Sequence, residues 1–148
     1  MTTPVYLAFI LAFMATVSFG ILFQAPRKTL LAMGAIGAIG WVVFVVLRQG
    51  MDYTSFNANF LAALTIAVLS EASARLFKQP TTVYLVPGII PLVPGLGMYK
   101  GMNQIIANNY EVGTSILLTA CTDAGAIALG LMMVASIFRV IKIRRGKI

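Results

Sequence analysis

Long apolar stretches alternate along the chain with short polar connections. No charged residue occurs in 1–26, 29–47, 53–70 or 79–99, and residues 112–138 contain only Asp123. A helix needs about 20 mainly apolar residues to cross a bilayer. The pattern therefore predicts an all-α integral membrane protein, in which five transmembrane helices occupy residues 4–23, 29–47, 56–77, 82–99 and 112–138.

The composition supports this class. Of the 148 residues, 59% are hydrophobic and 10% are charged, with a mean hydropathy of +0.93, whereas soluble domains carry about 25% charged residues. Five helices of about 20 residues use about 100 positions. We therefore expect a single transmembrane domain over residues 1–148. Because no basic segment precedes the first apolar stretch, we expect no cleaved signal peptide.

The basic residues predict the orientation, because Lys and Arg concentrate on the cytoplasmic side of a membrane. With five spans, the N-terminus outside and the C-terminus inside, only Arg48 and Lys100 lie outside. A four-span alternative with a re-entrant 82–99 divides the basic residues almost evenly. We therefore predict the five-span topology, with a basic cytoplasmic tail at 139–148 that lies against anionic lipids and does not bind nucleic acid.

Several kinds of chemistry lack the residues that they need. The chain has no histidine and one cysteine, Cys121, which excludes a disulfide framework and a metal site built from several cysteines. We expect Cys121 to be a small buried residue. The sequence also lacks a His-Glu-x-x-His motif and a nucleophile beside a plausible base, so we predict neither an enzyme nor a cofactor.

Small residues recur at helical spacing and predict close helix packing, because helices in lipid associate where their backbones can approach. The small residues are Ala8, Ala12, Thr16 and Gly20, then Gly34, Gly37 and Gly40, then Ala120, Ala124 and Ala128 flanked by Gly125 and Gly130. A tightly packed bundle accounts for them. They also leave surface for a second subunit.

The fourth apolar segment, residues 82–99, contains three prolines and three glycines. They are Pro87, Pro91 and Pro94, and Gly88, Gly95 and Gly97. Proline removes a backbone donor and clashes with the preceding helical turn. Unpaired backbone groups in a membrane must be buried in protein or line a wet cavity. We therefore predict a broken segment that forms a site near mid-membrane, at Pro91, as in many transporters. The alternative is a structural helix kinked by proline.

The run Pro91-Leu92-Val93-Pro94-Gly95, followed by Tyr99, Gly101 and Met102, resembles the signature of the threonine/serine exporter family, in its C-terminal five-helix half. In the split form of this family, that half is a small subunit paired with a larger five-helix partner subunit, and similar pairs are linked to succinate export. The resemblance implies export of small amino acids or dicarboxylates across the bacterial cytoplasmic membrane. An odd number of spans suits an inverted repeat, with the transport site between its two halves.

Asp123 is the acidic residue deepest in a predicted span. Ser115, Thr119 and Asp123 follow one another at intervals of four, with Thr122 adjoining, and so form a polar stripe. An acid at that depth costs about 2.5–3.5 kcal/mol and normally faces a cavity or a partner. One interpretation is a proton relay or part of the substrate site, which implies proton-coupled export. The other is a hydrogen-bonded clamp between helices.

Glu71 and Arg75 lie near the inner boundary with the favourable i, i+4 order for an ion pair. A local ion pair would let both charges approach the membrane. Alternatively, Arg75 binds the carboxylate of a substrate that arrives from the cytosol, and the pair acts as a gate.

Tyr84 and Tyr99 lie near opposite ends of the fourth segment, where aromatic residues often sit at lipid headgroups. Tyr99 is also a candidate for an outer gate. The predicted pathway for a small-molecule substrate consists of Pro87, Gly88, Pro91, Pro94, Gly95, Tyr99, Thr119, Thr122 and Asp123. The alternative function is a membrane assembly or regulatory subunit that does not itself transport.

Overall fold

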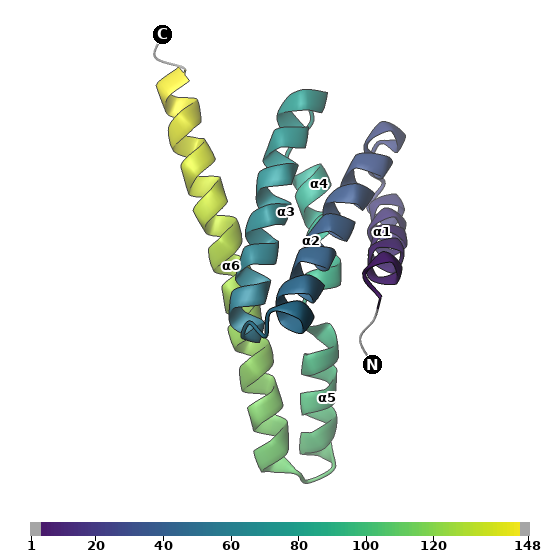
Figure 1. Ribbon diagram of the computed structural model, residues 1–148, viewed down its shortest axis with the longest axis vertical. Helices are drawn as coiled ribbons and strands as arrows, with labels where there is room; N and C mark the ends of the chain where they lie inside the picture. The colour runs from purple at the N-terminus through teal and green to yellow at the C-terminus, as the bar shows by residue number, and fades with distance from the viewer. Residues whose placement is uncertain (1–3, 146–148) are drawn as a thin grey trace.

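The computed structural model describes residues 4–145, with side chains as far as Val140, and its regular elements are helices (Figure 1). The helices are α1 Val5–Leu22, η1 Arg27–Thr29, α2 Leu30–Gly50, α3 Ser55–Phe77, α4 Thr82–Ile89, η2 Ile90–Leu92, α5 Gly95–Ile106 and α6 Tyr110–Arg145. Four spans are long and apolar enough to cross a membrane, and the pair Thr82–Leu92 and Gly95–Ile106, bent by 44°, makes a fifth. The predicted all-α membrane fold with a broken fourth segment is confirmed.

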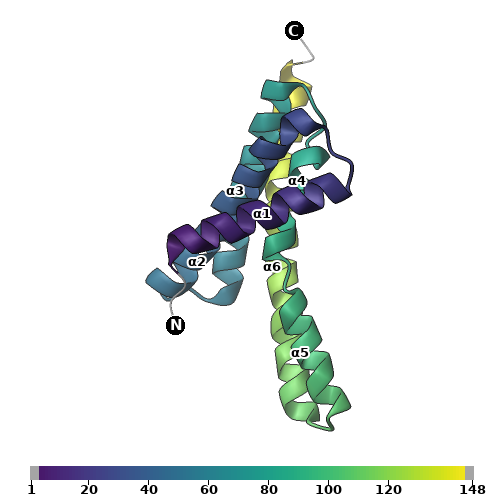
Figure 2. The same cartoon turned by 90° about the vertical axis from the view of Figure 1, so that its right-hand side faces the viewer.

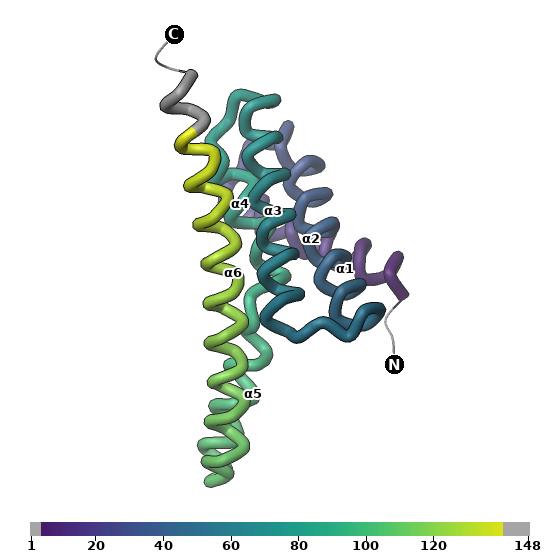
Figure 3. Tube along the Cα trace, turned by 60° about the vertical axis from the view of Figure 1, so that its left-hand side comes forward, coloured from purple at the N-terminus to yellow at the C-terminus, as the bar shows by residue number. Residues whose placement is uncertain are grey.

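The helices form a bundle from which one hairpin extends. α1 packs on α2, α2 on α3, and α4 lies against α2 and α3, while α5 packs mainly on α6. α5 and the first half of α6 extend beyond the end of the bundle at which α2 and α3 are joined (Figures 1 and 2). Figure 3 shows α6 as one rod that runs from the tip of this hairpin along the whole molecule.

The predicted small-residue packing is confirmed between α1 and α2. The buried residues of α1 are Ala8, Ala12, Thr16 and Gly20. A side chain on Gly37 would collide with Thr16, and one on Gly20 would collide with Met33. The two backbones therefore approach as closely as these small residues allow.

For α6, the prediction is right in part. Ala120 and Gly130 are buried as predicted, whereas Ala124, Gly125 and Ala128 are exposed. The face of α6 that packs on the bundle includes Asp123, which is hydrogen-bonded to α3. With Asp123 on the buried face, residues 124, 125 and 128 point outward. The same orientation exposes Cys121, contrary to the expectation that this residue is buried.

Tyr84 is not exposed, as a side chain in contact with lipid headgroups would be. Its side chain is fully buried in the core cluster that includes Met33 and Ile66, and its ring centroid lies 6.3 Å from that of Phe77. The short connection after α3 folds α4 back against α2 and α3, so the first turns of α4 are covered by protein.

The fourth segment breaks around Pro91, as predicted, but it ends later than predicted. Pro87 lies inside α4 without ending it, whereas Val93 is extended (ψ 129°) before Pro94. The break lies beside the start of α3, since the cavity there is shared with Asn59, so it is not midway along the bundle. Beyond the break, α5 continues to Ile106, because its polar residues remain exposed while its small residues pack on α6.

Candidate functional site

A cavity of about 440 Å³ lies where the break in the fourth segment meets α2, α3 and α6. It has the size of an ordinary ligand pocket. Its lining includes Trp41 and Phe44 from α2, Asn59 from α3, Pro91, Leu92, Val93 and Pro94 from the break, Leu96 and Gly97 from α5, and Ser115, Thr119 and Asp123 from α6. The structure thus brings the broken segment and the polar stripe of α6 together around one space.

Asp123 is the buried charge of this cavity, with 9% of its surface exposed. Its Oδ2 accepts a hydrogen bond of 2.8 Å from the Ser55 hydroxyl. The Asn59 amide in turn donates to the Ser55 carbonyl at 3.0 Å. The other oxygen, Oδ1, is buried without a hydrogen-bond partner. An unpaired buried acceptor costs about 1–3 kcal/mol, so a donor group that reached this oxygen would be stabilised by the hydrogen bond.

The N-terminus of α5 supplies a positive element to the same cavity. The amide of Met98 donates to the Pro94 carbonyl at 3.1 Å, which closes the first turn of α5. The Gly95 amide donates to the Val93 carbonyl at 2.7 Å, whereas the amides of Leu96 and Gly97 have no acceptor within the helix and carry the positive end of its dipole. Because Leu96 and Gly97 line the cavity, a helix end that favours anions lies in the same cavity as a carboxylate.

The hydroxyl groups of α6 contribute acceptors. The Thr119 hydroxyl donates to the Ser115 carbonyl at 3.0 Å, and the Thr122 hydroxyl donates to the Thr119 carbonyl at 2.8 Å. Their oxygens keep free lone pairs. Ser115 and Thr119 line the cavity, whereas Thr122 is exposed and does not belong to its lining.

Four other residues of the predicted pathway lie elsewhere. Pro87 borders a separate hollow beside the end of α1, and Gly88 packs against Ile66. Gly95 is exposed at the first position of α5, and Tyr99 is 69% exposed on the same helix. The cavity therefore uses Pro91 and Pro94 but not the earlier proline and glycine.

Ser55, Trp41, Phe44 and Gly97 belong to this site or support it, and the sequence interpretation did not include them. Ser55 bonds to a residue 68 positions away, which no local pattern indicates. The ring centroids of Trp41 and Phe44 lie 5.2 Å apart. In the sequence, these two residues are simply part of an apolar helix, and nothing there marks them as site residues. Of the four, Gly97 was the easiest to predict, because it lies within the run of prolines and glycines.

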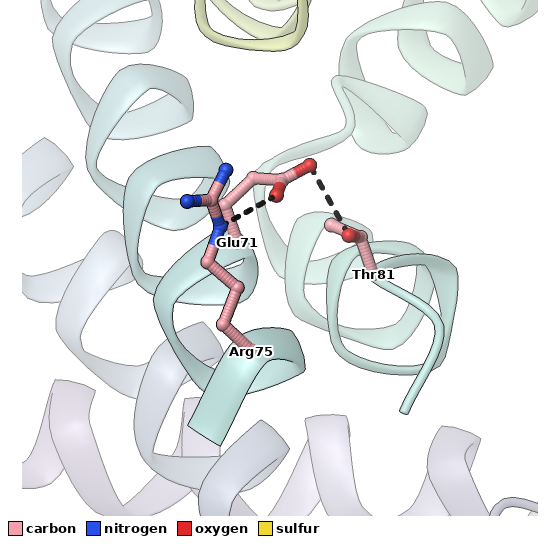
Figure 4. A network of polar contacts seen from close by, with 3 residues as sticks. All are labelled: Glu71, Arg75 and Thr81. Atoms are coloured by element: carbon pink, nitrogen blue, oxygen red, sulfur yellow. Dashed lines mark hydrogen bonds and ion pairs between the residues drawn. The ribbon is translucent and has the colours of Figure 1, made fainter. Parts of the chain in front are cut away.

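Glu71 and Arg75 meet at the opposite end of α3 (Figure 4). Arg75 Nε lies 3.9 Å from Glu71 Oε2, and the Thr81 hydroxyl donates to Glu71 Oε1 at 3.1 Å. The Arg75 guanidinium carbon lies 4.7 Å from the centre of the Phe138 ring on α6. The pair thus links the ends of three helices, away from Asp123.

Comparisons with known proteins agree with this architecture. The family described as "Threonine/Serine exporter, ThrE" matches residues 8–137. The threonine/serine exporter of Corynebacterium glutamicum is 27% identical over 77 residues, which cover 52% of this chain and 16% of that relative. No solved structure matches the chain significantly. Since the family match covers most of the sequence, this multi-pass membrane chain belongs to the threonine/serine exporter family.

Proposed function

We propose that this chain is a transport subunit of a secondary transporter that exports a small polar metabolite across the bacterial cytoplasmic membrane. The observation that carries the proposal is the cavity at the break of the fourth segment, which contains the buried and half-unpaired carboxylate of Asp123. Broken membrane helices that end at polar cavities commonly form transport sites. Membership of an exporter family supports the same function.

The chemistry of the cavity favours an amino acid. A zwitterion would place its carboxylate at the N-terminus of α5 and its ammonium group at Asp123 Oδ1. The hydroxyl group of threonine or serine would reach the oxygens of Ser115 and Thr119, which line the same space. A dicarboxylate such as succinate would bring a second anion towards Asp123, so the cavity fits threonine or serine better than succinate.

Asp123 also provides a means of coupling export to protons. The ionised carboxylate would bind the substrate ammonium group from the cytosolic side. A proton from outside would neutralise the carboxylate and release the substrate. Return of that proton to the cytosol would complete the cycle, so each molecule exported would accompany one proton moving inward.

We further propose that a larger subunit of the same family completes the transporter, as an inverted five-helix unit. The chain spans 16% of its relative's length. α6 has 36 residues, about 54 Å, against a hydrocarbon thickness of about 30 Å. Tyr99, Met102 and Ile106 are 69%, 54% and 71% exposed on one face of α5. With the N-terminus outside and the C-terminus inside, this face extends beyond the lipid, so the partner would cover it.

Export by a strain that carries Asp123→Asn tests the proposal. We expect at least about tenfold less threonine export on dipeptide feeding, at unchanged protein level, because the ammonium group loses its charged partner. Asp52→Asn, which changes the same residue type in the turn between α2 and α3, should export normally. Normal, pH-dependent export by Asp123→Asn would contradict the proposed function.

The exposed face of α5 also supports a second candidate, a subunit that assembles or regulates a transporting partner. In that case Asp123→Asn and Pro94→Ala would leave export intact, and only changes at Tyr99, Met102 or Ile106 would abolish it.

A further inference from the structure

A second cavity, of about 410 Å³, lies at the opposite end of the molecule from the α5–α6 hairpin. Its lining comes from the end of α3, the residue before α4 and the C-terminal half of α6. The residues are Glu71, Arg75, Thr81, Ala135, Ser136, Phe138 and Arg139. None of them lines the cavity around Asp123, so the two cavities are separate.

The Arg75 side chain makes two contacts within this cavity. Both oxygens of Glu71 are engaged, one by the Thr81 hydroxyl at 3.1 Å and the other by Arg75 Nε at 3.9 Å (Figure 4). The Arg75 guanidinium lies over the Phe138 ring, an arrangement that fixes its plane. Because the ion pair uses Nε, neither terminal Nη group of Arg75 has a hydrogen-bond or ion-pair partner within residues 4–140.

Arg139 adds a second guanidinium. It lines the same cavity and is exposed, and the described part of the chain offers it no ion-pair or hydrogen-bond partner. Two guanidinium groups and one carboxylate give the cavity a net charge of about +1 at neutral pH. Guanidinium groups with free Nη atoms bind carboxylate and phosphate oxygens in pairs, and Ser136 adds a hydroxyl donor at the same wall.

We propose that this cavity is an oxyanion-binding site, in which Arg75 and Arg139 hold a carboxylate or phosphate group. Glu71 acts as a positioning residue, because it orients Arg75 and is not free to bind a ligand. The oxyanion is either the carboxylate of the exported metabolite before it reaches Asp123 or the phosphate of an anionic lipid headgroup. Binding itself does not depend on the proposed transport function; only the carboxylate source does.

The test measures binding of two probes to the full chain in detergent. The probes are radiolabelled L-threonine and phosphatidylglycerol, the latter compared with phosphatidylcholine. Arg139→Gln is the main variant, because this exposed side chain is not needed for packing, and Arg75→Gln is the second. Arg27→Gln is the matched control: Arg27 is an exposed arginine of η1. It does not line the cavity. η1 precedes α2, and the other end of α2 is joined to α3 at the opposite end of the bundle, so Arg27 lies at the same end of the bundle as the cavity.

We expect both cavity variants to bind one of the probes at least about tenfold more weakly, since each loses a charge-assisted contact, while Arg27→Gln binds as the native chain does. Loss of threonine binding would identify a carboxylate site, and loss of phosphatidylglycerol binding a lipid site. If Arg139→Gln binds both probes as well as Arg27→Gln does, the proposal is wrong. The threonine measurements use an Asp123→Asn background, which removes the proposed binding group of the other cavity and leaves Arg75 and Arg139 in place.

Discussion

Asp123 presents two carboxylate oxygens in two different environments. Oδ2 is held by Ser55 across the α3–α6 interface, whereas Oδ1 is buried and unpaired beside the cavity. The sequence left two alternative roles for Asp123, a hydrogen-bonded clamp between helices and a group that binds substrate or a proton. Because the two oxygens differ, one residue can serve in both roles. The clamp orients the carboxylate, and the unpaired oxygen would gain a partner if a ligand or a proton reached it.

Ser55→Ala tests the clamp. Without the hydroxyl, both carboxylate oxygens lack a protein donor, so we expect a loss of about 1–3 kcal/mol in the free energy of unfolding, measured by thermal or denaturant unfolding. Ser18→Ala is the control, because the Ser18 hydroxyl is exposed and bonds only within its own helix, to the Met14 carbonyl. Equal stability of the two variants would show that the Ser55 contact is not structural.

At the scale of the element, the two prolines at positions 87 and 94 act differently. Pro87 lies near the end of α4, where it removes the amide donor for the Val83 carbonyl, yet the helix continues through it to Ile89. Pro94 favours the extended conformation of Val93, which separates the helical pieces. The position of a proline within its segment, more than the number of prolines, decides where the segment breaks.

Replacing these two prolines separates their roles. Pro94→Ala removes the restriction on Val93 and allows a more continuous helix through the cavity wall. We expect export to fall by about tenfold, about 1.4 kcal/mol in activation free energy, at normal protein level. Pro87→Ala should export nearly normally, because Pro87 does not line the cavity. The account of the break would be contradicted by equal effects of the two variants on export.

The sequence was sufficient for the features that depend on local pattern. Apolar run length predicted the spans, and the spacing of Ser115, Thr119 and Asp123 predicted a polar stripe whose residues share one cavity. The features that it missed depend on contacts between distant segments. The Ser55–Asp123 bond and the burial of Tyr84 both depend on how α3, α4 and α6 pack. The extension of α5 to Ile106 depends on its packing against α6. From the sequence alone, the polar residues in the second half of α5 predict a loop.

At the scale of the whole molecule, the bundle and the hairpin have different environments. The exposed faces of α1 to α3 consist mainly of apolar side chains, as lipid requires. The α5–α6 hairpin extends past them (Figure 2), and its exposed side carries Tyr99, Met102 and Ile106. In the proposed topology, these side chains lie outside the hydrocarbon, where apolar surface of this kind marks a protein interface.

Met102→Lys tests that interface. A charge in the middle of this apolar face should reduce co-purification of the larger subunit by about tenfold, since burying an unpaired charge at an interface is costly. Lys100→Gln changes one charge on the same helix but outside the face, and should co-purify normally. Undiminished recovery of the partner with Met102→Lys would mean that the partner docks elsewhere or not at all.

The most direct test of the central claim asks whether the cavity beside Asp123 contains water and substrate. In a Cys121→Ala background, Thr119→Cys places one thiol in the cavity wall, and Thr122→Cys places it outside. We predict that a water-soluble maleimide labels Thr119→Cys and that L-threonine slows this labelling severalfold, with no such effect at Thr122→Cys. A Thr119→Cys thiol that is unreactive, or equally reactive with and without L-threonine, would contradict a substrate site at the break.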